Sequence, residues 1–245
     1  MNLKDKIIII TGGSGLIGKS VLNDLRKSGA ISINLDVVSD DGLSNFFLKC
    51  DITSTNEVDK SITKILKKFN KIDGLINNAY PRTKDWSNLF ENIELNSWVK
   101  NIDLQLNSLF YFNQKIIKIM MNQKHGSIVN VGSIYGSLAP DFSLYKGLDM
   151  TMPAAYSAIK GGVINFTKYL ASYSGQNGIR VNTVSPGGIL DSQNINFIKR
   201  YSKKVPLGRM GNSFEISPAI IFLLSDSSSY ITGQNIIIDG GYSIT

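Results

Sequence analysis

Cysteine and histidine are almost absent from this sequence. Its 245 residues include one cysteine, Cys50, and one histidine, His125. One cysteine cannot form an internal disulfide framework, and the pair offers too few soft ligands for a tetrahedral metal site, so we expect no bound metal. Cys50 ends an apolar run, where a buried structural thiol is expected.

Long hydrophobic runs are also missing. No apolar run approaches the ~20 residues that a membrane helix needs. The N-terminal segment, Met1–Lys6, is short and polar and leads directly into the apolar run Ile7–Ile10. These features match neither a signal peptide nor a transit peptide, so we expect a cytoplasmic protein that does not bind membranes.

The chain carries a moderate positive charge. Charged residues make up 18% and hydrophobic residues 42% of the sequence, which suits a folded core rather than disorder. The net charge of +7 comes from 26 basic and 19 acidic residues, and the lysines are scattered, as at Lys64, Lys67 and Lys68. Without a dense basic run or a stacking motif, the charge favours a solvated basic surface over nucleic-acid binding.

Strand-like and helix-like segments alternate along the chain. Helical patterns occur at about residues 16–27, 54–69, 98–121, 153 onwards and 213–224. The alternation predicts one α/β domain over residues 1–245, a Rossmann-type doubly wound parallel sheet of about seven strands with helices on both faces. The predicted strands are Ile7–Ile10, Ile31–Leu35, Phe46–Cys50, Asp73–Asn77, Gly126–Val131, Ile179–Val184 and Asn235–Ile238.

Local signals refine these elements. Ser54 and Glu57 form a predicted capping box, and Pro153 is placed at the first position of its helix. Gly161-Gly162 interrupts that helix, so close packing against another helix is expected there. The segment at about 189–211 has no clear periodicity and is predicted to be mobile.

A glycine-rich segment, Thr11–Gly18, follows the first predicted strand and opens a helix. Its glycines at Gly12, Gly15 and Gly18 have the spacing G-x-x-G-x-x-G. In such a turn, backbone N–H groups and the helix dipole face a pyrophosphate, which larger side chains would block. The spacing alone is a weak signal, but the strand–turn–helix context indicates a dinucleotide site.

Asp36 ends the second predicted strand, 24 residues after Gly12. An acidic residue roughly 20 residues beyond the glycine motif accepts hydrogen bonds from the adenosine ribose hydroxyls and repels a 2′-phosphate. No Arg or Lys follows in Val37–Ser39. We therefore predict NAD(H) rather than NADP(H), with a solvated turn acid as the alternative interpretation of Asp36.

Tyr156 and Lys160 form the pair around which the chemistry is organised. Four residues apart in a predicted helix, their side chains lie on the same face. The Lys160 ammonium is expected to lower the pKa of the Tyr156 phenol from its usual value of about 10, so that the phenol can donate or accept a proton. Spacing alone is weak evidence, and an ordinary amphipathic helix is the alternative.

Six motifs occur in order along the chain: Thr11–Gly18, Asp51-Ile52, Asn77-Asn78-Ala79, Ser133, Tyr156-x-x-x-Lys160 and Ser185-Pro186-Gly187-Gly188. Together with the tail from Pro206 to Gly241, they resemble the short-chain dehydrogenase/reductase family in its short form. The resemblance covers nearly the whole chain. The sequence is also similar to the subset of that family associated with bacterial surface-glycan and flagellin-modification pathways.

The resemblance implies a role for each matching residue. Tyr156 would be the general acid in ketone reduction or the general base in alcohol oxidation, and Lys160 would also bind the nicotinamide ribose. Ser133 would hold the substrate oxygen and stabilise the charge that develops on it. The residues implied to bind the cofactor are Gly12, Ser14, Gly15, Leu16, Ile17, Gly18, Asp36, Asp51, Ile52, Asn78, Ala79, Tyr156, Lys160, Pro186, Gly187 and Ile189.

The chain departs from the family pattern at several positions. Tyr80 replaces a usual glycine after the Asn-Asn-Ala motif, which predicts a narrower cofactor groove. Gln105 takes the place of a catalytic asparagine, with Asn107 as the alternative at this position. The usual threonine after the Pro-Gly motif falls at or near Asp191 or Ser192, which leaves the contact with the nicotinamide amide open.

The gap of 23 residues between Ser133 and Tyr156 is longer than the family's usual gap. The extra residues lie at about 141–151 and include Tyr145, Lys146 and Asp149. A loop there is expected to overhang the substrate side of the nicotinamide and to supply polar contacts to a hydroxyl-rich or anionic substrate, such as a sugar or a sugar phosphate. A surface loop without a role in binding is the alternative.

The sequence therefore favours an NAD(H)-dependent dehydrogenase or reductase of a small polar hydroxyl or keto compound, such as a sugar derivative. A 3-oxoacyl-carrier-protein reductase, which the tail resembles, is the first alternative, although Asp36 and the inserted loop argue against it. A dinucleotide-binding protein without turnover is the second. By resemblance, the helix at 98–121 and the Tyr156 helix would pair with copies of themselves in a homotetramer, or in a homodimer.

Overall fold

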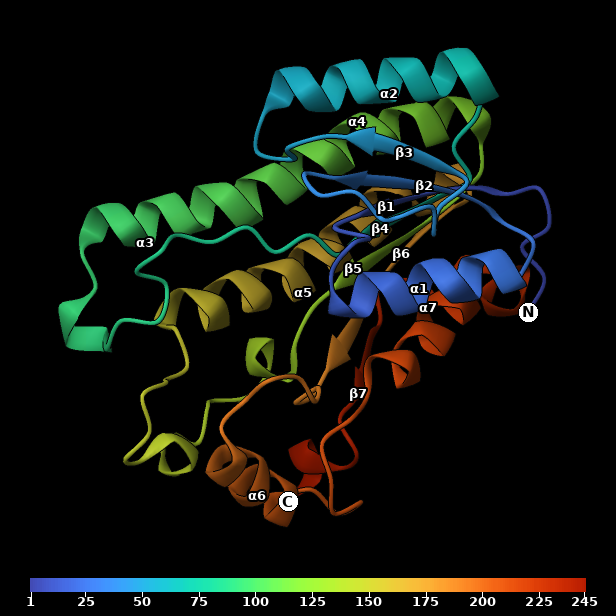
Figure 1. Cartoon of the computed structure of the whole chain (residues 1–245). Coiled ribbons are helices and arrows are strands. Elements are labelled where there is room, and N and C mark those ends of the chain that lie inside the picture. Colours follow the sequence, from blue (N-terminus) through green and yellow to red (C-terminus); the bar gives the residue numbers. More distant parts are fainter.

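The computed structural model describes residues 1–245, and its centre is a sheet of seven parallel strands in the order β3-β2-β1-β4-β5-β6-β7 (Figure 1). The order reverses between β1 and β4, which is where doubly wound sheets bind ligands. The predicted fold class is confirmed. The strands are β1 (Ile7–Thr11), β2 (Ile31–Asp36), β3 (Phe46–Lys49), β4 (Gly74–Asn77), β5 (Gly126–Val131), β6 (Ile179–Pro186) and β7 (Asn235–Ile238).

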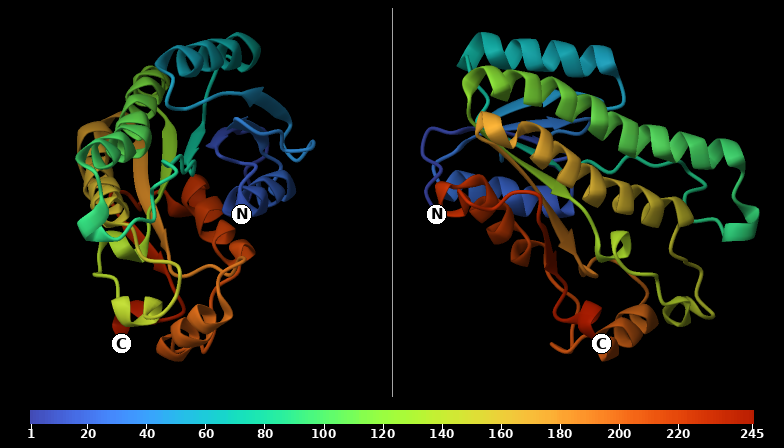
Figure 2. Two further views of the ribbon diagram at one scale, coloured as in Figure 1. Left: turned by 60° about the vertical axis from the view of Figure 1, so that its left-hand side comes forward. Right: turned by 180° about the vertical axis from the view of Figure 1, so that it is seen from behind.

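Helices cover both faces of the sheet (Figure 2). On one face lie α1 (Leu16–Lys27) and α7 (Ser217–Leu224), and on the other lie α2 (Thr55–Phe69), α4 (Ser108–Gln123) and α5 (Ala154–Ser174). Two shorter helices, α3 (Leu95–Ile102) and α6 (Ile195–Lys204), extend beyond the carboxyl ends of the strands. No helix combines the length and the apolar character needed to span a membrane.

The isoleucine run of β1 contributes to both hydrophobic cores. Successive strand side chains point to opposite faces. Ile7 and Ile9 accordingly pack with α2, α4 and α5, whereas Ile8 and Ile10 pack with α1 and α7. All four side chains are at most 3% exposed, so a continuous apolar run here marks a central strand covered on both sides.

Several predicted boundaries need correction. The helix expected at 98–121 consists of α3, a π-helical segment at Asp103–Asn107, and α4. Pro153 is the N-cap of α5, not its first helical residue. Ser54 does cap α2, accepting a hydrogen bond from Glu57 N at 3.3 Å, but the Glu57 carboxylate accepts from Asp51 N at 2.8 Å, so the predicted capping box is not closed.

Two predicted irregular regions have defined structure. Helix α5 runs without a break through Gly161-Gly162, and a Cβ on Gly162 would lie 3.1 Å from the Leu106 side chain, so the expected close packing is present. The segment at 189–211 contains α6, which the sequence did not predict, with Phe197 and Tyr201 buried.

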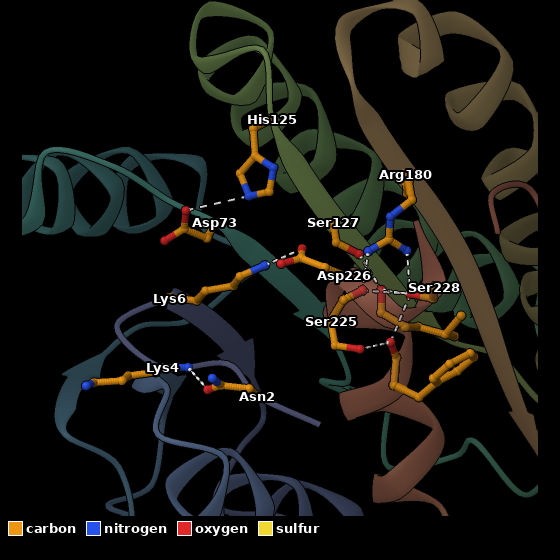
Figure 3. Close-up of polar contacts among 12 residues, drawn as sticks. Asn2, Lys4, Lys6, Asp73, His125, Ser127, Arg180, Ser225, Asp226 and Ser228 are labelled. Atoms are coloured by element: carbon orange, nitrogen blue, oxygen red, sulfur yellow. Dashed lines mark hydrogen bonds and ion pairs between the residues drawn. The ribbon is translucent and has the colours of Figure 1, made fainter. Parts of the chain in front are cut away.

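Polar contacts link several segments at the amino ends of the strands (Figure 3). The Arg180 guanidinium donates to Ser228 Oγ at 2.8 Å and to the Ser225 carbonyl at 3.1 Å. Lys6 pairs with Asp226 at 2.6 Å. These contacts tie the start of β6 and the segment before β1 to the turn that follows α7, and burial lowers the pKa of Arg180.

We expect Arg180→Met to lower the free energy of unfolding by about 2 kcal/mol, because the Ser225 carbonyl and the Ser228 hydroxyl lose a charged donor. Urea unfolding measures the loss. The affinity for NADH should not change, since the predicted dinucleotide site is at the carboxyl ends of the strands, at the opposite end of the sheet. Lys4→Met, which removes an exposed cation from the same end, is the control, and equal stability of the two variants would contradict the prediction.

Candidate active site

A groove of about 820 Å³ runs along the carboxyl ends of the strands. It is lined by the ends of strands β1 to β6 and the segments that follow them, together with the side chains of Tyr156 and Lys160 from α5. The predicted cofactor residues that line it are Gly12, Ser14, Gly15, Leu16, Ile17, Asp36, Asp51, Ile52, Asn78, Ala79, Tyr156, Lys160, Pro186, Gly187 and Ile189.

Gly18 is the one predicted cofactor residue outside the groove lining. A Cβ on Gly18 would lie 2.3 Å from the Gly12 carbonyl oxygen and 2.6 Å from Gly13 Cα. A glycine is required at position 18 because α1 approaches the preceding turn closely there. The third glycine of the motif is therefore a packing residue in this structure.

The turn before α1 fits a pyrophosphate. Gly12 has φ +67°, and a Cβ there would lie 2.7 Å from Ala79 Cα, so no side chain can occupy this position without strain. Helix α1 begins without a side-chain cap, and Gly15, Leu16 and Ile17 face the groove. Free N–H groups and the positive end of the helix dipole meet there, which is the chemistry that binds phosphate.

Asp36 lines the groove at the end of β2, with its carboxylate held in place. One oxygen accepts from Ser14 N at 2.9 Å and the other from Val38 N at 3.1 Å, while Ser14 Oγ donates to the Val38 carbonyl at 2.7 Å. The only cations that line the groove are Arg82 and Lys160. Neither follows β2, so no basic side chain adjoins Asp36 in this lining.

A second cavity, of about 260 Å³, joins the groove at its other end. Four residues line both spaces: Tyr80, Tyr156, Gly187 and Gln193. Ser133 lines the second cavity beside Tyr156. The structure thus brings Ser133, Tyr156 and Lys160 to the junction of a long groove and a compact cavity.

Buried hydrogen bonds hold α5, which carries Tyr156 and Lys160, against the sheet. Asn130 of β5 donates to Thr167 Oγ1 of α5 at 2.9 Å and accepts from Asn77 of β4 at 2.8 Å. Thr183 of β6 donates to the same Thr167 oxygen at 2.8 Å. These four side chains lie deep between helix and sheet and place α5 relative to three strand ends.

Lys160 is anchored at the base of the groove. Its Nζ donates to the Val131 carbonyl at 2.7 Å and lies 5.7 Å from the centre of the Tyr156 ring. Ser133 follows Val131 by two residues and caps a short 3-10 turn, where its Oγ accepts from Tyr135 N at 3.2 Å. The end of β5 therefore positions both Ser133 and the lysine.

The protonation of this pair differs from the sequence-based expectation. Burial raises the pKa of the Tyr156 phenol, and the neighbouring Ser133 hydroxyl only partly offsets that rise. Burial also lowers the pKa of Lys160 to about 8. The expectation that Lys160 lowers the pKa of Tyr156 does not hold in the free protein, because burial is the main influence on the pKa of both groups.

Tyr80 closes one side of the junction with aromatic contacts. Its ring meets Tyr156 edge to face at a centroid distance of 5.6 Å and Trp86 at 5.7 Å. Arg82 lies 5.3 Å from the same ring. The residue that replaces the usual glycine thus supports the Tyr156 ring, a packing that a glycine could not provide.

Gln105 and Asn107, the two candidates for the fourth catalytic position, differ in burial. Gln105 is 6% exposed within the π-helical segment, and its buried Nε2 has no hydrogen-bond partner. Asn107 is exposed and donates to Asp103. Gln105 lines a small space beside Thr11 and Asn77 rather than the junction itself, so it is the inward-facing residue of the two but does not border Tyr156.

Gln193, which the sequence did not single out, lines both the groove and the second cavity. Asp191 and Ser192, the two positions suggested for the contact with the nicotinamide amide, do not. Both of those residues are exposed and outside the lining. Gln193 Nε2 donates to the Ile189 carbonyl at 2.7 Å, and its Oε1 accepts from Asp191 N at 2.7 Å. These two bonds fold the side chain back over the groove. No sequence signal marks it, because the bonds depend on the local fold of the segment.

The inserted loop does border the second cavity, although only one of the three residues named for it, Tyr145, lies in the lining. Tyr145, Met150 and Thr151 line it, whereas Lys146 and Asp149 are exposed and lie outside the lining. Gly188, from the Ser-Pro-Gly-Gly motif, also lines it, and the remaining wall comes from residues that the sequence did not connect with a site: Ile134, Tyr135, Met152, Pro153, Phe197, Tyr201 and Met210.

We expect Lys160→Met to abolish turnover yet raise the free energy of unfolding at pH 7. The wild-type protein must bury a cation whose pKa is lowered to about 8, and the variant does not. Above pH 8 the folded wild type loses that proton while the unfolded chain, with a pKa near 10.4, still binds it, so the advantage of the variant shrinks as pH rises.

Thermal unfolding of both proteins between about pH 6.5 and 9.5 measures this difference, because the range begins below the folded pKa of Lys160 and extends into the window between its folded and unfolded pKa values. Lys64→Met, at an exposed position of α2 without an ion pair, is the control for loss of one positive charge. A stability gap that is absent at pH 7, or that widens with pH, would contradict the prediction.

Comparisons with known proteins match this sequence over nearly the whole chain. A family sequence profile described as enoyl-(acyl carrier protein) reductase matches residues 21–243. Post-translational flagellin modification protein A of Campylobacter coli is 32% identical over 255 residues, covering 99% of this chain and 100% of the relative.

Two further relatives have names that refer to a substrate or a cofactor. The 3-oxoacyl-(acyl-carrier-protein) reductase of Buchnera aphidicola subsp. Schizaphis graminum is 34% identical over 257 residues, with all of both chains covered. A crystal structure of a short chain dehydrogenase from Leptospira borgpetersenii, with bound NAD+, superimposes with a TM-score of 0.91 at 36% identity, covering 99% of this chain and 94% of that one.

Proposed function

The chain belongs to the short-chain dehydrogenase/reductase family of oxidoreductases, and on this basis we propose that it is an NAD(H)-dependent enzyme acting on a small polar carbonyl compound or secondary alcohol. The substrate that we propose is a sugar derivative. The observation that carries the proposal is the junction of the dinucleotide-sized groove with a compact cavity at Ser133, Tyr156 and Lys160.

The proposed mechanism assigns proton transfer to Tyr156. When bound, the nicotinamide supplies a hydride from its C4 to the substrate carbon, or accepts one in the reverse direction. In reduction, Tyr156 Oη donates its proton to the carbonyl oxygen, which becomes the hydroxyl of the product. Ser133 Oγ donates a hydrogen bond to that oxygen as negative charge develops on it.

Lys160 has two tasks in this proposal. Its Nζ binds the nicotinamide ribose, and its charge stabilises the phenolate that Tyr156 becomes after giving up its proton. The bond to the Val131 carbonyl fixes the ammonium at the base of the groove for both tasks. Gln105 is assigned a supporting role, because its buried amide faces inward from the helix before β5.

We propose NAD(H) over NADP(H). Asp36 has a carboxylate fixed by two backbone N–H groups, and no cation adjoins it in the groove lining to balance a 2′-phosphate. The Leptospira relative, which is 36% identical, holds NAD+. We also place the enzyme in the cytoplasm, where free NAD(H) would be available to it.

The sugar assignment has support from the cavity and from one relative. No charged side chain lines the second cavity, so an uncharged sugar derivative suits it better than a sugar phosphate. The Campylobacter relative is named for flagellin modification. The alternative is a 3-oxoacyl-carrier-protein reductase, which the 34% identical Buchnera relative favours. A protein that binds dinucleotide without turnover is disfavoured, because Ser133, Tyr156 and Lys160 are all in place.

A homotetramer, with a homodimer as the alternative, is the assembly that we propose. Helix α5 carries an outward row of aromatic rings, in which Phe166 stacks on Tyr169 at 6.0 Å and Tyr169 on Tyr173 at 6.1 Å. Tyr169 and Tyr173 are about three-fifths exposed, and Phe110 of α4 is exposed beside Phe166. Burial of such a row against a second copy would remove a large apolar area from water.

We expect Tyr156→Phe to reduce turnover by at least about a hundredfold, because the proton donor is lost while the ring contacts with Tyr80 and Trp86 remain. The dissociation constant for NADH, measured by fluorescence titration, should stay within about twofold. Tyr169→Phe, on the outer face of the same helix, is the control. A Tyr156→Phe enzyme with nearly full activity would show that the proton donor has been assigned wrongly.

We expect wild-type protein to bind NADH more tightly than NADPH, and Asp36→Asn to narrow that difference about tenfold or more, because the charged acceptor for the ribose hydroxyls is lost. Titration of each protein with both cofactors measures the ratio. Asp41→Asn, at an exposed position of the same turn, is the control. Tighter binding of NADPH by the wild type would overturn the assignment of NAD(H).

A further inference from the structure

The outer wall of the substrate cavity consists of two segments that are far apart in the sequence. The inserted loop, residues 141–151, lies beside α6, and both extend past the carboxyl ends of the strands (Figures 1 and 2). Tyr145 of the loop and Phe197 of α6 both line the cavity and pack at a centroid distance of 5.2 Å. The loop is therefore part of the binding cavity and is held there by α6.

Arg200 of α6 holds the loop by its backbone. Its Nη1 donates to the Leu144 carbonyl at 3.2 Å and to the Lys146 carbonyl at 2.6 Å. These are the two residues that flank Tyr145. A second contact, the ion pair between Lys204 of α6 and Asp141, holds the start of the same loop. Arg200 itself does not line the cavity, so its effect on a substrate must pass through Tyr145.

The cavity that Tyr145 borders is apolar at its walls but rich in phenol groups. Five of its sixteen lining residues are tyrosines, and none is charged. Tyr145 and Tyr135 are 6% and 7% exposed, and the buried Tyr135 hydroxyl makes no hydrogen bond of normal geometry within the protein, although burial and the neighbouring Tyr145 phenol raise its pKa. A buried unpaired hydroxyl is costly, so a ligand oxygen that reaches it would be favoured.

This combination matches one class of ligand. A saturated ring with hydroxyl groups presents apolar C–H faces, which pack on aromatic rings, and oxygens at its edge, which phenols can bond. A long acyl chain needs an extended channel rather than a compact space of about 260 Å³, and an anionic substrate needs a cation that this cavity lacks.

We propose that Tyr145 is a specificity residue that selects compact, uncharged, oxygen-bearing rings, and that Arg200 is a positioning residue that holds Tyr145 in the cavity. The inference rests on the proposed function. It assigns the inserted loop to substrate recognition through an aromatic ring that is fixed from a neighbouring helix.

The test compares Arg200→Met with Lys199→Met, its exposed neighbour on the same helix, which makes no ion pair. Oxidation is followed with NAD+ and four alcohols: D-glucose, myo-inositol and trans-cyclohexane-1,2-diol as rings, and propane-1,2-diol as a short open chain. Arg200→Met should raise KM for the ring substrates about tenfold, with kcat and the NADH dissociation constant within about twofold. KM for propane-1,2-diol should not change, because that molecule is too short to depend on the position of Tyr145.

Lys199→Met should match the wild type throughout. Arg200→Lys should recover part of the lost ring affinity, because an ammonium can still donate to one or both carbonyls. Equal KM values for Arg200→Met and Lys199→Met would overturn the role of Arg200. A loss of NADH affinity as large as the rise in KM would also overturn it, since a general loosening of the fold would then explain both.

Tyr145→Ala tests the proposal without relying on the folding of the Arg200 variant, because it leaves the backbone carbonyls that Arg200 binds. It should raise KM for the rings relative to the open chain by about tenfold. An unchanged ratio would overturn the role of Tyr145 alone. A wild-type protein that binds NADH yet oxidises none of the ring compounds would instead overturn the proposed function, and this inference with it.

Discussion

A buried chain of hydrogen bonds between α5 and the sheet determines where the reactive groups stand. Thr167 accepts from Asn130 of β5 and from Thr183 of β6, and Asn130 accepts in turn from Asn77 of β4. All of these side chains are at least nine-tenths buried, where an unmade hydrogen bond is costly and a made one is directional. A rotation or shift of α5 would break both bonds to Thr167 together, and Tyr156 and Lys160 are fixed with it.

The groove and the second cavity differ in which part of the chain forms them. The groove proposed to bind the cofactor is formed largely by backbone. The glycine turn, the uncapped start of α1 and the strand ends present N–H groups and let a ligand approach the backbone closely, so few side chains are needed. The substrate cavity uses side chains from the inserted loop, α6 and the segments after β5 and β6. A backbone cradle suits a constant ligand, whereas a side-chain wall can change with the substrate, so the proposed substrate specificity belongs to the second cavity.

Reactive groups are kept in an environment that does not favour their charge. Lys160 is buried enough to lower its pKa to about 8, and its ammonium has a carbonyl and two aromatic rings nearby rather than a carboxylate. A carboxylate at this place would stabilise the cation more, but its negative charge would disfavour the Tyr156 phenolate and raise the pKa of the phenol further. Burial of Lys160 without a carboxylate partner therefore lowers the stability of the free protein, but it leaves the Tyr156 phenol without a permanent anionic neighbour.

The sequence by itself determined the α/β sheet, its seven strands and most of the cofactor groove. These depend on local signals: isoleucine runs for central strands, glycines where a turn meets Ala79 or the helix meets the turn, and Asp36 at a strand end. Only the tertiary structure decided the π-helical segment around Gln105, helix α6, the place of Gln193 and the wall formed by Tyr145 and Phe197. Each of these depends on contacts between residues distant in the chain, such as Arg200 with the carbonyls beside Tyr145, and such contacts leave no periodicity or spacing in the sequence.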